Sequence, residues 1–131
     1  MSKTPSSMVH EWQQQLDALL GNIEAWAESR NWHVHSASTT RSEEGLGAYE
    51  TRVLTIQSPE GRLIVDPIGR KIAGADGRVD VYAWPSLNRV VLLADHGAWR
   101  IRTESGVDWP KKWGRKTFLE IADQLARTSQ G

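Results

Sequence analysis

Short apolar segments separated by turn-forming residues fill the middle of the chain, from Tyr49 to Thr103. The turn signals are SPEG at 58–61, DG at 76–77, PSLN at 85–88 and DHG at 95–97. Their spacing is typical of strands that follow one another in an antiparallel meander. The middle of the chain is therefore predicted to form a sheet, and no catalytic signature runs through it.

About six strands are predicted in this part of the chain. Pro67 is expected to interrupt the sheet, because proline cannot donate a hydrogen bond within a central ladder. Residues 68–77 are then interpreted as a loop or a short edge strand. Asp95-His96-Gly97 predicts a three-residue hairpin loop with Gly97 in the left-handed conformation. The predicted strands cover residues 33–40, 49–57, 62–66, 79–84, 89–93 and 98–103.

Helical patterns flank the sheet on both sides. One apolar stripe predicts a helix over residues 8–30, with Ser6 or Ser7 as its cap. A second apolar face predicts a helix over residues 114–128. The first stripe covers too few heptads for a coiled coil with a second copy, so we expect it to pack on the sheet. The first stripe consists of Val9, Trp12, Leu16, Leu19, Ile23 and Trp26, and the second of Phe118, Ile121, Ala122 and Leu125.

These elements predict a single α+β domain with an N-terminal amphipathic helix, an antiparallel meander of about six strands and a C-terminal helix. Both helices are expected on one face of the sheet, which leaves the other face partly in water. A chain of 131 residues is long enough for one core. We place the domain at residues 8–128, with a flexible tail at 1–7 and a short tail at 129–131.

Composition narrows the classes of function. The chain has no cysteine, which removes thiolate nucleophiles, disulfides and cysteine zinc sites and fits a reducing, cytoplasmic location. Its 16 basic residues balance 16 acidic ones, so no global charge steers it toward nucleic acid or a membrane. No segment approaches the roughly 18 apolar residues of a membrane span. Nucleophile-elbow, Walker, dinucleotide-binding and zincin motifs are missing, so we expect no cofactor and disfavour an enzyme.

A metal site is the first chemical alternative. His33 and His35 lie two apart on a predicted strand, so both imidazoles point to the same face and could hold one Zn²⁺. A third ligand would come from His96, Glu43 or Glu44. We favour the simpler interpretation, in which the two histidines are half-exposed on a polar edge strand.

Paired carboxylates are the second alternative. Glu50, Asp66 and Asp80 lie on predicted strands near basic residues. A metal-dependent nuclease would need an acid-x-Lys pattern beside such an acid, and Asp80-Val81-Tyr82 has no lysine there. We therefore expect these carboxylates to be solvent-facing charges that pair with basic residues across the sheet.

Basic residues gather around the start of the predicted C-terminal helix, with two tryptophans among them. Cations at a helix N-terminus oppose its dipole, so stability does not explain them. A phosphate or carboxylate bound there would explain the basic residues, and the tryptophans could stack on nucleic-acid bases. We favour the alternative, in which Lys111 and Lys112 lie in a loop while Trp109 and Trp113 cover the edge of the core. The cluster consists of Lys111, Lys112, Arg115 and Lys116 with Trp109 and Trp113.

Aromatic and arginine side chains are predicted to share the sheet face opposite the helices. Tyr82 and Trp84 alternate with apolar residues in one strand, and Arg100 and Arg102 do so in another. Such a face suits a protein partner, a single-stranded RNA or simply solvent. The predicted patch combines Tyr82, Trp84, Arg100, Arg102, Trp109 and Trp113, with Arg89 at its margin.

We interpret the chain as a non-enzymatic protein-interaction or adaptor module. Its expected partner is another protein or a second copy of the chain, bound at the aromatic and arginine face. The alternatives are nucleic-acid or anion binding at the basic helix start and a metal-dependent enzyme that uses His33 and His35.

Overall fold

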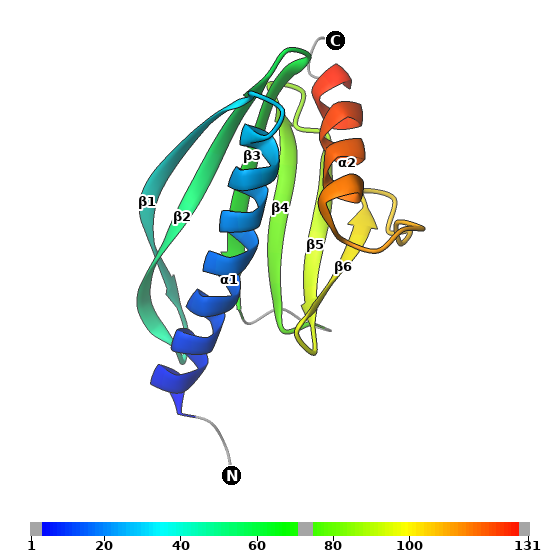
Figure 1. Cartoon of the computed structure of the whole chain (residues 1–131). Helices are drawn as coiled ribbons and strands as arrows, with labels where there is room; N and C mark the ends of the chain where they lie inside the picture. Colours follow the sequence, from blue (N-terminus) through cyan, green and yellow to red (C-terminus); the bar gives the residue numbers. More distant parts are fainter. Residues whose placement is uncertain (1–3, 71–74, 129–131) are drawn as a thin grey trace.

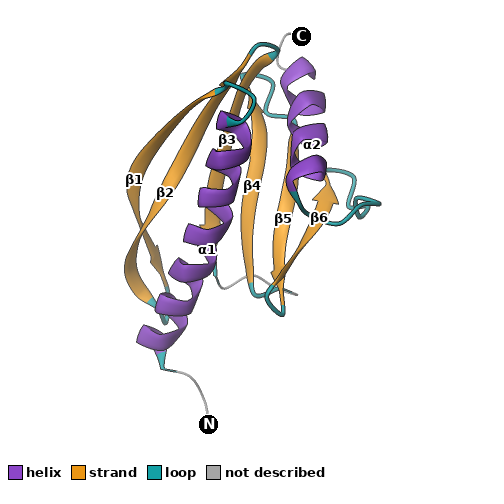
Figure 2. Ribbon diagram, viewed as in Figure 1, coloured by secondary structure: helices purple, strands orange, loops and turns teal. Residues whose placement is uncertain are grey.

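The computed structural model describes residues 4–70 and 75–128 (Figure 1). As predicted, one helix precedes a meander of six antiparallel strands and a second helix follows it. The strands are neighbours in chain order, and both helices lie on the same face of the sheet (Figure 2). Neither helix of this described part is long and apolar enough to cross a membrane. The elements are α1 (Pro5–Glu28), β1 (His33–Glu43), β2 (Gly47–Ser58), β3 (Gly61–Gly69), β4 (Gly77–Trp84), β5 (Arg89–Asp95), β6 (Ala98–Thr103) and α2 (Arg115–Thr128).

α1 begins three residues earlier than the apolar periodicity predicts. Pro5 fits the first turn, where a helix needs no N–H donor. Thr4 is the N-cap in place of the predicted Ser6 or Ser7, and its hydroxyl accepts from the Ser7 N–H at 3.1 Å. The helix therefore takes in part of the segment expected to be a tail, while residues 1–3 and the predicted tail at 129–131 lie outside the described residues.

The core lies between the two helices and one face of the sheet. α1 contacts β1 and β2, α2 contacts β3 and β4, and the helices contact each other. Burying each large aliphatic or aromatic side chain there stabilises the fold by about 1.5–3 kcal/mol. The predicted helical faces are confirmed, because their central residues are buried. The core includes Trp12, Leu16, Leu20, Ile23, Leu54, Ile56, Leu63, Val65, Val79, Val81, Ala83, Leu92, Phe118 and Ile121.

The predicted interruption at Pro67 is wrong, because β3 continues to Gly69. β2 pairs with β3 only as far as Leu54 opposite Val65, and beyond that point the β1–β2 hairpin diverges from β3. Pro67 then has a strand partner, Val79, on one side only. A proline in this position removes no ladder hydrogen bond to β2, so the strand accommodates it. Ile68 and Gly69 belong to β3 rather than to a loop, and residues 71–74 of the predicted loop lie outside the described residues.

Side chains from the β1–β2 hairpin bridge the gap where β2 leaves β3. Arg41 Nε donates to the Pro67 carbonyl at 3.1 Å, and the Glu43 carboxylate accepts from the Arg70 N–H at 3.0 Å. The Tyr49 hydroxyl contacts Glu43 and accepts from Trp12 Nε1 at 3.3 Å. Burial, reinforced by the Glu43 carboxylate, raises the pKa of Tyr49 to about 12.

The β5–β6 loop is one residue shorter than predicted. Asp95 ends β5, and the loop consists of His96 and Gly97, with φ values of 49° and 82°. Two consecutive left-handed residues match the twist of a two-residue hairpin, which is why Gly97 follows His96 here. The prediction of a left-handed Gly97 is confirmed.

Candidate binding site on the helix-free face of the sheet

The face of the sheet that carries no helix presents a regular array of side chains. Its members alternate along each strand with core residues, as the sequence predicted for β4 and β6. Cross-strand pairing arranges them in rows that run across β4, β5 and β6. The rows are Arg78–Leu93–Arg100, Asp80–Val91–Arg102 and Tyr82–Arg89.

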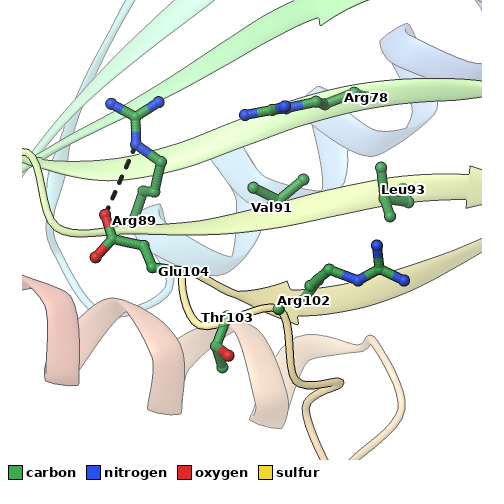
Figure 3. Close-up of a pocket in the computed structure, with 8 residues that line it drawn as sticks. Arg78, Arg89, Val91, Leu93, Arg102, Thr103 and Glu104 are labelled. Atoms are coloured by element: carbon green, nitrogen blue, oxygen red, sulfur yellow. Dashed lines mark ion pairs between the residues drawn. The ribbon is translucent and has the colours of Figure 1, made fainter. Parts of the chain in front are cut away.

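A groove of about 360 Å³ crosses this array. Val91 and Leu93 of β5 form its apolar floor (Figure 3). Arg78 of β4 lies on one side of this floor and Arg102 of β6 on the other, so guanidinium groups flank the aliphatic side chains. Arg89 and Glu104 lie together at one end, with Arg89 Nε 3.9 Å from the Glu104 carboxylate. We call this feature the arginine groove.

Asp80 holds two of the groove arginines in place. Its side chain is only 1% exposed although it lies on the helix-free face. One carboxylate accepts from Arg78 Nε at 2.6 Å and Nη2 at 3.0 Å, and from Arg89 Nη1 at 2.8 Å. This hydrogen bonding to Asp80 raises the pKa of Arg78. Because Asp80 is shared, two guanidinium charges stand against one carboxylate at the base of the groove.

A second carboxylate lies directly beside Asp80. Asp66 is its cross-strand partner on β3 and bonds to Arg41 Nη2 at 2.5 Å. Burial raises the pKa of Asp66, and the negative charge of Asp80 raises it further. The expected pairing of carboxylates with basic residues is therefore present, but Asp80 is buried rather than solvent-facing. Glu50, the third carboxylate considered, is exposed on β2.

Two arginines on β6 each have an Nε donor that makes no hydrogen bond with the described residues. Within the described part of the chain, the Nε atoms of Arg100 and Arg102 are buried without a hydrogen-bond partner. Arg102 Nε lies 3.6 Å from Asp108 Oδ1, and Arg100 Nε lies 3.5 Å from Asp95 Oδ2. A buried donor left in this state carries a desolvation penalty, which the nearby Asp95 and Asp108 carboxylates offset in part.

Aromatic side chains follow along β4, beyond the arginine groove. Arg89 lies over the Tyr82 ring at 5.2 Å, a cation–π distance. Burial, more than any neighbouring charge, raises the pKa of Tyr82. Trp84 follows at the end of the strand with 47% of its surface exposed, and Leu87 in the next loop is also exposed.

The structure divides the patch that was predicted from the sequence. It places Tyr82, Trp84, Arg89, Arg100 and Arg102 on the helix-free face, with Arg100 and Trp84 toward opposite ends of that face. Trp113 instead packs on the helix side against Trp26 and Phe118, with ring centroids 5.7 and 5.8 Å away. Trp109 covers the outer edge of β6, where its backbone N–H donates to the Ile101 carbonyl at 2.8 Å. Trp109 and Trp113 therefore do not belong to the sheet-face patch, because both pack against the core.

The basic residues near the start of α2 have varied surroundings. Lys111 Nζ binds both carboxylate oxygens of Glu120 at 2.9 Å. Arg115 Nη2 donates to the Ser29 hydroxyl at 3.1 Å. Lys112 and Lys116 are exposed. The contacts of Lys111 and Arg115 are intramolecular, which favours a structural role for these two side chains.

The two histidines of the metal alternative lie on the edge strand β1, and both are exposed. His96, a proposed third ligand, lies in the loop between β5 and β6 at the other end of the strand order, and Glu43 is engaged by Tyr49 and Arg70. Among the residues that the structure describes, no group of three metal-ligating side chains could hold an ion.

Six groove residues were missed by the sequence reading, namely Arg78, Val91, Leu93, Thr103, Glu104 and Gly106. Arg78 stands one position before the predicted strand, where the same alternation would have included it. Val91 and Leu93 belong to the run VVLLA, which is apolar on both faces and so gives no alternation to read.

Comparisons with known proteins found no match to this chain. No family model matches it, and neither does any curated protein or solved structure.

Proposed function

We propose that the protein is a binding module that holds a segment of another protein on the helix-free face of its sheet. The observation that carries the proposal is the arginine groove, in which Arg78 and Arg102 flank an apolar floor, on a sheet face that also carries an exposed tryptophan. Arginine, tyrosine and tryptophan are the residues that contribute most to protein–protein binding.

Each part of this face has a distinct role in the proposal. Trp84 and Leu87 supply apolar area that a partner would cover. Arg100 and Arg102 supply guanidinium groups on side chains that are 40% and 41% exposed, beside the Asp95 and Asp108 carboxylates. Asp80 fixes Arg78 and Arg89 before a partner arrives, which lowers the entropy lost on binding.

A second copy of the chain is the other partner that this face could accept. Self-association through one face would give a two-fold dimer in which each groove meets the same surface of its neighbour. Sedimentation velocity over a range of protein concentrations separates the cases. A dimer lost in Trp84→Ala would identify the second copy as the partner, and a monomer would leave a different protein.

A display experiment tests the proposal directly. Random peptides are selected on the immobilised protein and then compared on the variants Trp84→Ala and Arg102→Ala. We expect enriched peptides to bind both variants more weakly, while thermal unfolding of the variants stays close to that of the parent protein. Arg30→Ala, an exposed arginine beyond the end of α1, is the matched control and should bind normally. Enriched peptides that ignore both groove substitutions would refute the proposal.

Nucleic-acid binding at the start of α2 is not part of this proposal. Lys111 and Arg115 already have protein partners, and Trp113 is packed between the helices. That alternative predicts affinity for single strands that falls steeply with salt and with neutralisation of Lys112 and Lys116.

A further inference from the structure

We infer that the segment bound in the arginine groove is acidic, with the pattern acidic-x-aliphatic-x-acidic in an extended conformation. This inference rests on the proposed function and names the chemistry of its partner. The carboxylates would bind Arg78 and Arg102, and the aliphatic side chain would cover Val91 and Leu93.

The register of the sheet sets the spacing of this pattern. Arg78 pairs with Leu93 and Arg102 pairs with Val91, so the two arginines lie two strands apart and are offset by two residues along the strands. Neighbouring strands are about 4.8 Å apart and two residues advance about 6.7 Å, which places the two Cα atoms about 12 Å from each other. In an extended peptide, residues four apart lie on the same side and span about 13 Å. The residue midway between them also faces the sheet and meets the apolar floor.

The guanidinium groups of Arg78 and Arg102 are suited to binding carboxylates. Arg102 donates no hydrogen bond within the described part of the chain, and 41% of its side chain is exposed, so its terminal nitrogens can reach a ligand. Arg78 uses Nε and Nη2 on Asp80 and keeps Nη1. Guanidinium groups bind carboxylates in a two-pronged geometry that lysine cannot reproduce, so the arginine forks themselves carry the recognition.

The protein's own carboxylates already stand at the rim of the groove. Glu104 lies 3.9 Å from Arg89, and Asp108 lies 3.6 Å from Arg102, and both side chains are mostly exposed. These separations exceed hydrogen-bond length, and exposed pairs of this kind contribute about 0–1 kcal/mol. An incoming carboxylate can therefore displace them, and removing one of them should favour the ligand.

A pair of synthetic peptides tests the inference. The acidic probe is acetyl-Gly-Glu-Ser-Leu-Ser-Glu-Gly-amide, and its control carries glutamine in place of both glutamates. Affinity is measured with fluorophore-labelled peptides, and the Nε–H signals of the arginines are followed by NMR during titration. We expect the acidic probe to bind about tenfold more tightly than the control, because each charge-assisted hydrogen bond adds to affinity. The Arg102 signal should move, while that of Arg30 stays in place.

Three variants and one control sharpen the test. Arg102→Ala should weaken the acidic probe about tenfold, and Arg102→Lys should also weaken it several-fold, although it keeps the charge. Asp108→Asn should strengthen binding about twofold to threefold, since it removes the carboxylate that lies beside Arg102. Arg30→Ala should leave the affinity unchanged.

Several results would overturn the inference. Equal affinity for the acidic and neutral probes, or an unmoved Arg102 signal at millimolar acidic peptide, would do so. A single-stranded oligonucleotide that displaces the acidic probe at lower concentration would identify a phosphate backbone as the ligand instead. If displayed peptides depend on Trp84 and Arg102 but lack acidic residues, the inference fails while the proposed function stands. If no displayed peptide depends on them, the proposed function itself fails.

Discussion

Asp66 on β3 and Asp80 on β4 are cross-strand partners, so two like charges face each other at the centre of the helix-free face. Such a pair is destabilising unless cations compensate it. Arg41 binds Asp66, and Arg78 and Arg89 bind Asp80, so the two carboxylates are set among three guanidinium groups. Arg78 and Arg89 are thus anchored by a charge network rather than free in solvent.

Removing Asp80 should destabilise the protein and loosen the groove. We expect Asp80→Ala to lower the free energy of unfolding by about 2–4 kcal/mol, because the two arginines lose their common buried partner. Urea unfolding measures this change. Glu120→Gln is the control, since its partner Lys111 is 54% exposed and a surface pair of this kind should contribute less than about 1 kcal/mol. Equal effects of the two substitutions would show that Asp80 is an ordinary surface charge.

Asp66 should titrate above its ordinary value of 3.8, because burial and Asp80 both favour its protonated form. A carboxyl whose pKa is higher in the folded protein than in the unfolded chain binds its proton more readily when folded. Its contribution to stability therefore falls as the pH rises from 3.8 through the folded pKa, and recovers as the pH is lowered through the same window.

Carbon-detected NMR of the aspartate carboxyls measures the Asp66 pKa. Asp80→Asn should lower it by removing a negative neighbour, and Arg41→Ala should raise it by removing a positive one. A midpoint below 3.8 in the parent protein, or shifts of the opposite sign in the variants, would contradict the described network.

Alternation along the chain was sufficient to place Tyr82, Trp84, Arg100 and Arg102 on one face. The strands β4 and β6 each switch between apolar and polar residues with a period of two, and this pattern depends only on local geometry. The apolar periodicity of the helices and the order of elements are local in the same sense, which explains why most of the fold could be predicted.

Features that depend on residues distant in the sequence could not be predicted from this alternation. Asp80 is buried because Arg89, nine residues away, reaches across from β5. Trp113 belongs to the helix layer because it meets Trp26 of α1. Pro67 is tolerated because β2 diverges from β3. In each case the outcome is set by pairing between elements, which composition and periodicity do not specify.

Gly77 should be intolerant of any side chain. A Cβ atom built there would lie 2.4 Å from the Trp12 ring, which is itself 1% exposed and has no room to move. We expect Gly77→Ala to lower the free energy of unfolding by about 1–3 kcal/mol through overpacking. Gly21→Ala is the matched substitution within α1, where no atom lies within 4 Å of the new Cβ. It should raise stability by about 0.5–1 kcal/mol through helix propensity, and urea unfolding compares the two variants.

Trp113 and Trp84 should behave oppositely when truncated, because one is packed and the other is exposed. Trp113 contacts Trp26 and Phe118 between the helices, so Trp113→Ala should lower the free energy of unfolding by about 2–4 kcal/mol. Trp84 is 47% exposed, so Trp84→Ala should change stability by less than about 1 kcal/mol while it weakens the selected peptides. Thermal unfolding and peptide affinity, measured on the same two variants, separate these roles. A Trp84→Ala protein that melts many degrees lower would mean that Trp84 supports the fold, and the binding face would then have to be drawn without it.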